Sequence, residues 1–203
     1  LRQYGDFHSF YSDKSNLKKI VSNDTTLNYP SSKIIDDSIG YISLPTHLSM
    51  NEKDNFIYAD TLRKQIRLLD EKYSIKGWIV DLRGNGGGNM WPMLAGLNPI
   101  IEDGTVGYFV SKGKRIKWQS TSNNNYKCKN LHNKIAILID SLTGSSGEMA
   151  AISLLGRENS KSFGTKTSGY TTANQNFKLS NGAMLFLATA YCEDRTKKKY
   201  IGK

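Results

Sequence analysis

The sequence has 203 residues, 38% of them hydrophobic and 23% charged, which is the balance of a globular protein with its own core. No run approaches the roughly 18 apolar residues of a membrane-spanning helix, so we expect no membrane-spanning segment in this chain. The net charge of +10 raises the question of an anionic partner. The lysines are scattered, apart from a tight run at 197–199, and no nucleic-acid-binding motif accompanies them. We therefore expect a solvated basic surface and no nucleic-acid partner.

The N-terminal part of the sequence predicts little regular structure. Residues 1–11 look like the end of a helix running into a turn, and residues 12–33 are rich in Ser, Asn, Asp and Lys, as a surface loop is. We therefore expect the end of a helical segment with its loop over residues 1–33 and a core domain over residues 34–203. The sequence starts in the middle of a structural pattern and stops abruptly, as an excised fragment does. The absence of a targeting signal therefore says little about its location.

From residue 39 onward, apolar strands alternate with amphipathic helices. Strands are expected at residues 39–45, 78–83 and 134–140, the last two nearly all apolar, as buried parallel strands are. Helices are expected along 62–73, where apolar residues recur every three or four positions and Gly77 ends the helix, near 90–97, and from 145 to 155. Hairpins are expected around Gly113 and, within 176–194, at Asn181-Gly182. This alternation predicts an α/β domain with a largely parallel sheet.

A glycine-rich turn, "DLRGNGGGN" at residues 81–89, follows the second strand. Successive glycines lack a Cβ, so their backbone N–H groups can converge on a ligand, and ligands collect at the carboxyl ends of strands in an α/β sheet. The spacing fits neither of the common phosphate-binding glycine motifs. An oxyanion hole, which stabilises charge on a carbonyl oxygen under attack, and a plain glycine turn remain as interpretations.

The stretch "LIDSLTGSSGEMAAISLL", residues 138–155, runs from a buried strand through a tight turn into a helix. Ser145-x-x-Glu148 fits a capping box, in which the serine caps the helix and the glutamate reaches back. The same arrangement of strand, turn, serine and helix is what an acyl-transfer nucleophile requires, with the Ser146 N–H directed at an oxyanion. Both interpretations stay open on this stretch alone.

A nucleophilic serine needs a base within hydrogen-bond reach. The sequence holds three histidines, His8, His47 and His132, each of which is unremarkable in its local context. Lys166 is a further candidate, because burial can lower the pKa of a lysine enough for it to act as a base.

The two cysteines, Cys128 and Cys192, are too few for a disulfide scaffold and form no CxxC pair. One bridge between them would require an oxidising compartment. Two isolated thiols are favoured, and a thiol enzyme is the weakest alternative, because neither cysteine follows a motif at a helix start.

Three segments in order, "GWIVDLRGNGGGN", "LTGSSGEMAA" and "FGTKTSGYTTAN" followed by "LSNGA", resemble the core of the C-terminal processing (tail-specific) serine protease family. The resemblance covers roughly residues 39–202. It implies a crotonase-like α/β fold and cleavage of peptide bonds in partly unfolded proteins, often near the C-terminus. The regulatory PDZ domain of the family has no room between these segments.

The resemblance also implies roles for individual residues. The nucleophile of the family falls on Ser145, the oxyanion glycines on Gly87 and Gly88, and the second oxyanion donor on the Ser146 amide. The threonine near the catalytic lysine matches Thr167, whereas Tyr170 stands where the serine–lysine branch has its base. Apart from the resemblance, the capping box gives Glu148 the role of fixing the turn from behind.

This departure at Tyr170 fits a histidine-base branch similar to the tricorn protease core, which carries its histidine near the N-terminus. "GDFHSFY" resembles that segment, so His8 becomes the favoured base, ahead of Lys166. The branch orients its base with a carboxylate near the C-terminus, where this sequence has Ile201 in place of a glutamate. Glu193 and Asp194 are candidate orienting acids, with a backbone carbonyl, a water or no group at all as alternatives.

We therefore predict a serine-type peptidase that acts on peptides or unfolded proteins through an acyl-enzyme on Ser145, with no cofactor and no metal. One rival is a catalytically impaired protease-like module that binds peptides or hydrophobic ligands. The other is a basic protein that binds anionic partners. The resemblance favours an extracytoplasmic setting, and the sequence leaves the oligomeric state open.

Overall fold

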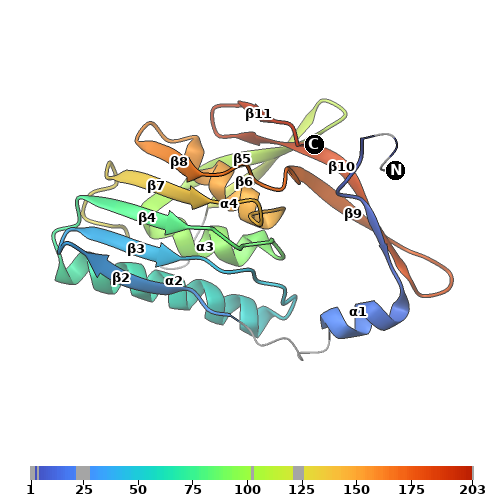
Figure 1. The fold of residues 1–203 in the computed structure, drawn as a ribbon, viewed down its shortest axis with the longest axis horizontal. Coiled ribbons are helices and arrows are strands. Elements are labelled where there is room, and N and C mark those ends of the chain that lie inside the picture. The colour runs from blue at the N-terminus through green and yellow to red at the C-terminus, as the bar shows by residue number, and fades with distance from the viewer. Residues whose placement is uncertain (1–2, 4, 22–27, 102, 121–125, 203) are drawn as a thin grey trace.

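The computed structural model describes residues 3, 5–21, 28–101, 103–120 and 126–202, and their strands form two sheets (Figure 1). The first sheet has the order β2-β3-β4-β7-β8, and its members from β3 to β8 run parallel, whereas β2 pairs with β3 in the antiparallel sense. These strands are β2 (Ser31–Ile35), β3 (Ile39–Ser43), β4 (Gly77–Asp81), β7 (Lys134–Ile139) and β8 (Ser160–Gly164).

The second sheet is antiparallel throughout, with β10 at its centre. Its strands are β1 (Phe10–Ser12), β5 (Gly104–Ser111), β6 (Lys114–Ser120), β9 (Thr172–Lys178), β10 (Met184–Asp194) and β11 (Lys199–Tyr200). The α/β prediction is correct, but a largely parallel sheet describes only the first of the two. Hairpin turns such as Lys112-Gly113, both at positive φ, join neighbouring strands and can connect them only as antiparallel pairs.

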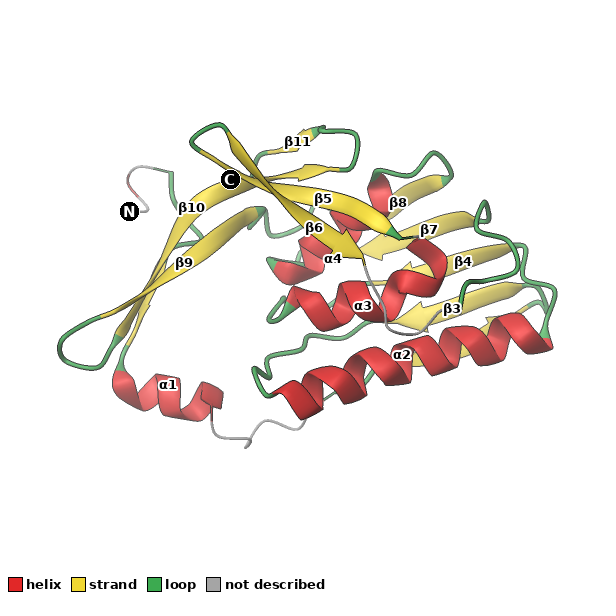
Figure 2. Ribbon diagram, turned by 180° about the vertical axis from the view of Figure 1, so that it is seen from behind, coloured by secondary structure: helices red, strands yellow, loops and turns green. Residues whose placement is uncertain are grey.

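Three helices cover one face of the first sheet, and two of them lie between the sheets (Figure 2). They are α2 (Glu52–Lys72), α3 (Met90–Ile101) and α4 (Ser146–Leu155). α3 and α4 contact strands of the second sheet as well as each other. The core joins these layers, with Trp78 of β4 and Trp118 of β6 both buried in it. None of the helices in the described ranges combines the length and apolar character needed to cross a bilayer.

The second half of α2 forms where the apolar spacing predicts it, because Leu62 and Ile66 are fully buried against the core, but the helix begins at Glu52, well before the expected start at residue 62. Its start is fixed by Asn51, whose side-chain oxygen accepts a hydrogen bond from the Lys53 N–H at 2.8 Å. The helix ends at Lys72, before Gly77, which begins β4 instead of ending the helix.

The N-terminal part has more regular structure than its polar composition predicts. Residues 10–12 form β1, and α1 (Lys14–Val21) follows, starting where the Asp13 carboxylate accepts the Asn16 N–H at 2.8 Å. β2 begins at Ser31, so the boundary expected after residue 33 falls inside a strand. Residues 1–2 and 4 of the expected helix end, and residues 22–27 of the expected loop, lie outside the described residues.

Candidate active site

The glycine-rich turn and the turn before α4 lie side by side at the carboxyl ends of β4 and β7. These strands are parallel neighbours, with Asp81 opposite Leu138, so the segments that follow them emerge together. The Gly144 N–H donates to the Asn85 carbonyl at 2.9 Å and joins the two turns directly. The parallel pairing therefore brings the glycine turn next to Ser145, and a Cβ on Gly87 would lie 2.9 Å from the Ser145 Cβ.

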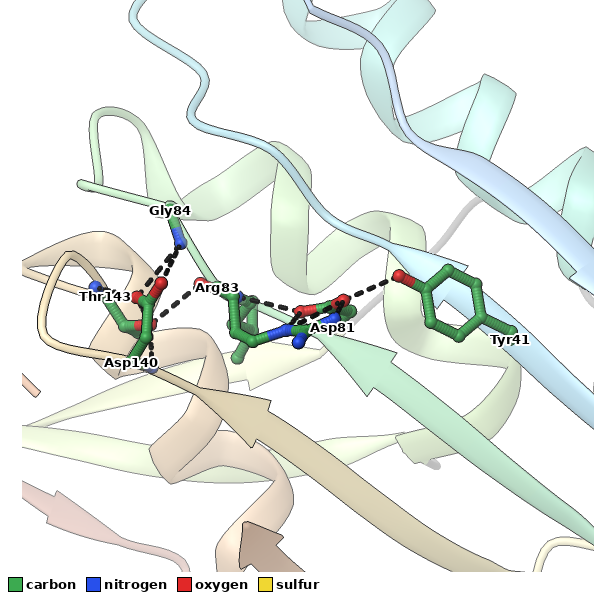
Figure 3. Close-up of polar contacts among 7 residues, drawn as sticks. Tyr41, Asp81, Arg83, Gly84, Asp140 and Thr143 are labelled. Carbon is green, nitrogen blue, oxygen red and sulfur yellow. Dashed lines mark hydrogen bonds and ion pairs between the residues drawn. The ribbon is translucent and has the colours of Figure 1, made fainter. Parts of the chain in front are cut away.

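Two carboxylates anchor this junction (Figure 3). The Asp140 carboxylate accepts the N–H groups of Gly84 at 3.0 Å and Thr143 at 2.9 Å, one from each turn. The Asp81 carboxylate accepts hydrogen bonds from the Arg83 guanidinium and from the Tyr41 hydroxyl, each at 2.6 Å. Burial raises the pKa of Asp81, but these donors lower it more. Both carboxylates therefore hold fixed the backbone that leads into the glycines and the serine.

Ser145 stands at the start of α4 with φ 50° and ψ −120°, a conformation that L-residues rarely adopt. The Glu148 carboxylate accepts the Ser145 N–H at 2.9 Å and helps to hold the backbone there. The Oγ of Ser145 lies 3.1 Å from Nε2 of His8, which is 137 residues away in the chain. An acyl-transfer nucleophile needs a strained turn of this kind and a base at this distance, so the arrangement is compatible with that chemistry.

Glu148 is a buried centre of hydrogen bonding behind the serine. Besides the Ser145 N–H, its carboxylate accepts the Thr167 hydroxyl at 2.6 Å and the N–H groups of Gly169 and Tyr170 at 2.8 and 2.7 Å. The structure thus brings Thr167 and Tyr170 to Glu148, and it places the segment that carries them beside the start of α4. With these donors around it, Glu148 is a structural anchor of the turn.

His8 reaches the serine from a segment that lies against the β9–β10 hairpin. β1 pairs with β10, and the Asn174 side-chain amide donates to the His8 carbonyl at 3.1 Å. The imidazole stacks on the Tyr170 ring with 5.1 Å between centroids, and its Nδ1 lies 2.6 Å from the Thr172 hydroxyl. Burial lowers the pKa of His8 below its ordinary 6.5, although the Asp6 charge and the Thr172 contact act in the opposite direction.

The backbone N–H groups expected to stabilise an oxyanion differ in whether they already donate a hydrogen bond within the protein. Gly87 and Gly88 have φ of 112° and 105°, and a Cβ on Gly87 would lie 2.9 Å from the Ser145 Cβ. The Gly87 N–H donates to the Asn85 side-chain oxygen at 3.0 Å, so the expectation that it faces an oxyanion is wrong for this conformation. Within the described ranges, the N–H groups of Gly88 and Ser146 make no hydrogen bond, which leaves them as the candidate donors.

His47 holds the glycine turn, a role that its local sequence did not indicate. It is buried, and its ring Nε2 lies 2.7 Å from the Asn55 side-chain oxygen. Its backbone N–H donates to the Gly87 carbonyl, and its carbonyl accepts the Asn89 N–H at 2.7 Å. A Cβ on Gly88 would lie 2.0 Å from that carbonyl oxygen, so this close approach requires glycine.

Several predicted candidates have other partners or are exposed. Glu193 is buried and pairs with Arg115 at 2.7 Å, and the buried Asp194 accepts hydrogen bonds from the 196–200 segment. Each of these two carboxylates is therefore engaged by donors other than the imidazole of His8. Lys166 and His132 are exposed.

Cys128 and Cys192 are both free and buried, and burial raises the pKa of both thiols, which leaves no activated thiolate. The described residues contain no cluster of His, Cys, Asp and Glu that could hold a metal ion.

Comparisons with known proteins show which chains this one is similar to. The model of peptidase family S41 matches residues 38–203. The nisin-resistance protein of Lactococcus lactis subsp. lactis is 32% identical over 207 residues, which cover 97% of this chain and 63% of that protein. This chain therefore spans less than two thirds of that relative.

Two solved structures have a similar fold. A lipoprotein from Streptococcus agalactiae matches with a TM-score of 0.80 and 31% identity, over 95% of this chain and 68% of the other. A photosystem II D1 C-terminal processing protease matches with a TM-score of 0.65 and 18% identity, over 89% of this chain and 48% of the other.

Proposed function

Because this chain belongs to peptidase family S41, we propose that it is a serine endopeptidase with a crotonase-like fold, Ser145 as its nucleophile and His8 as its base. The observation that carries the proposal is the 3.1 Å contact between Ser145 Oγ and His8 Nε2. The strained backbone of Ser145 and the unengaged N–H groups beside it support the same assignment.

In the proposed reaction, Nε2 of His8 accepts the proton of the Ser145 hydroxyl as Oγ attacks a peptide carbonyl. The N–H groups of Gly88 and Ser146 stabilise the oxyanion of the tetrahedral intermediate. The imidazolium then donates its proton to the leaving amine, and an acyl-enzyme on Ser145 remains. Water, activated by the same His8, hydrolyses the ester and regenerates the serine.

The proposed substrates are unfolded or C-terminal segments of proteins, cleaved outside the cytoplasm. Family membership supports peptide substrates, and the similar lipoprotein supports a cell-envelope setting. Nisin is a second candidate substrate, because a relative 32% identical to this chain is named a nisin-resistance protein. The rival proposal, a module that binds peptides without cleaving them, makes the opposite prediction for turnover.

The proposal is tested by treating the protein with a fluorophosphonate and, separately, with a denatured protein and with nisin. We expect a single covalent adduct, mapped by peptide mass analysis to Ser145, and cleavage products from one or both substrates. The activated Oγ is the reason, because an ordinary serine hydroxyl does not react with this reagent. A protein that forms no adduct and binds peptides without cleaving them would replace the peptidase with the binding module.

We expect peptidase activity to depend on a neutral His8. Because burial lowers the pKa of His8 below 6.5, the base is unprotonated at neutral pH, and activity falls only as the pH drops through that lowered pKa. The measurement is kcat/KM of the free enzyme between about pH 5 and 8. An acidic limb centred at or above 6.5 would contradict this assignment. Asp6→Asn tests the same assignment from the other direction. Because the Asp6 charge raises the pKa of His8, its loss should move the acidic limb of the kcat/KM profile to lower pH.

A further inference from the structure

We propose that Thr172 is the residue that positions His8, with its hydroxyl in the place where a serine–histidine pair usually has a carboxylate. This inference rests on the proposed peptidase function and adds the third member of its site. The observation behind it is the 2.6 Å distance between Thr172 Oγ1 and His8 Nδ1, on the side of the ring opposite Ser145.

The direction of this hydrogen bond follows from the chemistry of the other ring nitrogen. To accept the Ser145 proton, Nε2 must carry a lone pair, so the neutral imidazole has its hydrogen on Nδ1. Nδ1–H then donates to Thr172 Oγ1, which selects the reactive tautomer. When Nε2 takes the proton, the same bond becomes charge-assisted and therefore stronger.

The backbone around Thr172 is held so that the hydroxyl keeps this place. Thr172 begins β9, opposite Tyr191 of β10. The preceding Thr171 is buried, its carbonyl accepts the Cys192 N–H, and its hydroxyl donates to the Tyr200 carbonyl at 3.2 Å. The base and its positioning residue thus both depend on the β9–β10 hairpin.

The acidic side chains described near His8 have partners other than its Nδ1, which contacts the Thr172 hydroxyl. Asp6 accepts the backbone N–H of His8 at 3.2 Å, so it meets the main chain of the histidine. Glu148 is engaged by the donors of the serine turn, and Glu193 by Arg115. Tyr170 is the other titratable group against the ring, which it contacts by stacking. A neutral oxygen therefore orients the base, and Asp6 contributes negative charge from the backbone side.

The test compares Thr172→Val, which keeps the shape and removes the oxygen, with Thr172→Ser, which keeps the oxygen. We expect Thr172→Val to lower kcat about 10- to 100-fold with little change in KM, and Thr172→Ser to retain most of the activity. Thr189→Val is the matched control, because Thr189 is an exposed threonine on β10. Thermal unfolding of each variant distinguishes a lost hydrogen bond from a damaged fold.

A second measurement reads the tautomer directly. Nitrogen NMR of labelled histidine should show His8 with its hydrogen on Nδ1 in the wild type, and a mixture of tautomers in folded Thr172→Val. Equal kcat and an unchanged tautomer in Thr172→Val would overturn the inference. If wild type forms no fluorophosphonate adduct and cleaves no peptide, the proposed function fails instead, whereas an active wild type with an unaffected Thr172→Val variant removes only the role of Thr172.

Discussion

Replacing Ser145 with alanine is expected to abolish peptide cleavage, lowering kcat by about 10⁶-fold, while the affinity for peptide stays close to that of the wild type. The variant loses only the attacking oxygen. The backbone bond from residue 145 to the Glu148 carboxylate remains, so the turn and α4 should keep their structure. Turnover of a denatured protein, peptide binding to the variant and fluorophosphonate labelling measure the three quantities separately.

Ser153→Ala is the matched control for this experiment. Ser153 lies on the same helix, and its hydroxyl donates only to the Ala150 carbonyl one turn before it. We expect this variant to keep full activity and labelling. Undiminished cleavage by Ser145→Ala would exclude Ser145 as the nucleophile and, with it, the acyl-enzyme mechanism.

Replacing His8 with alanine is expected to lower kcat/KM by about 10⁴- to 10⁶-fold, because no group remains to accept the serine proton. Fluorophosphonate labelling of Ser145 should slow in parallel, since it depends on the same proton transfer. The residual activity should also lose its acidic limb, which distinguishes loss of the base from general damage to the site.

His132→Ala removes an exposed histidine and serves as the control, with no expected effect. Labelling that survives in His8→Ala at the wild-type rate would contradict the assignment of the base. Lys166 would then be tested by Lys166→Ala in the same background. That outcome is unexpected, because the Ser145 hydroxyl already lies 3.1 Å from His8 Nε2 and Lys166 is exposed.

The site is assembled from parts that differ in how firmly they are held. Ser145 and the glycine turn are fixed between parallel strands and by buried groups such as Asn85 and Glu148. His8 lies instead on a short N-terminal segment. The β1–β10 pairing and the contacts of His8 with the side chains of Thr172 and Asn174 attach this segment to the second sheet. Changes that loosen this segment should reduce proton transfer more than they reduce peptide binding.

The elements that the sequence predicted well are those fixed by short-range spacing. The apolar period specified the second half of α2, and the apolar runs specified β4 and β7. The glycine turn and Ser145-x-x-Glu148 could be located because each requires particular residue types at neighbouring positions. Local chemistry also identified Glu148 as the group that reaches back to the serine N–H, and the structure has that bond.

The sequence did not reveal features that depend on contacts between distant segments. By itself it determined the α/β alternation and the chemical groups available, because these follow from residue types a few positions apart. Only the tertiary structure decided that β5 and β10 pair as antiparallel neighbours in the second sheet. It also decided that Thr172, 164 residues from His8, lies against Nδ1 in place of Glu193 or Asp194. Such partners are selected by the packing of two sheets against shared helices, which no local spacing encodes.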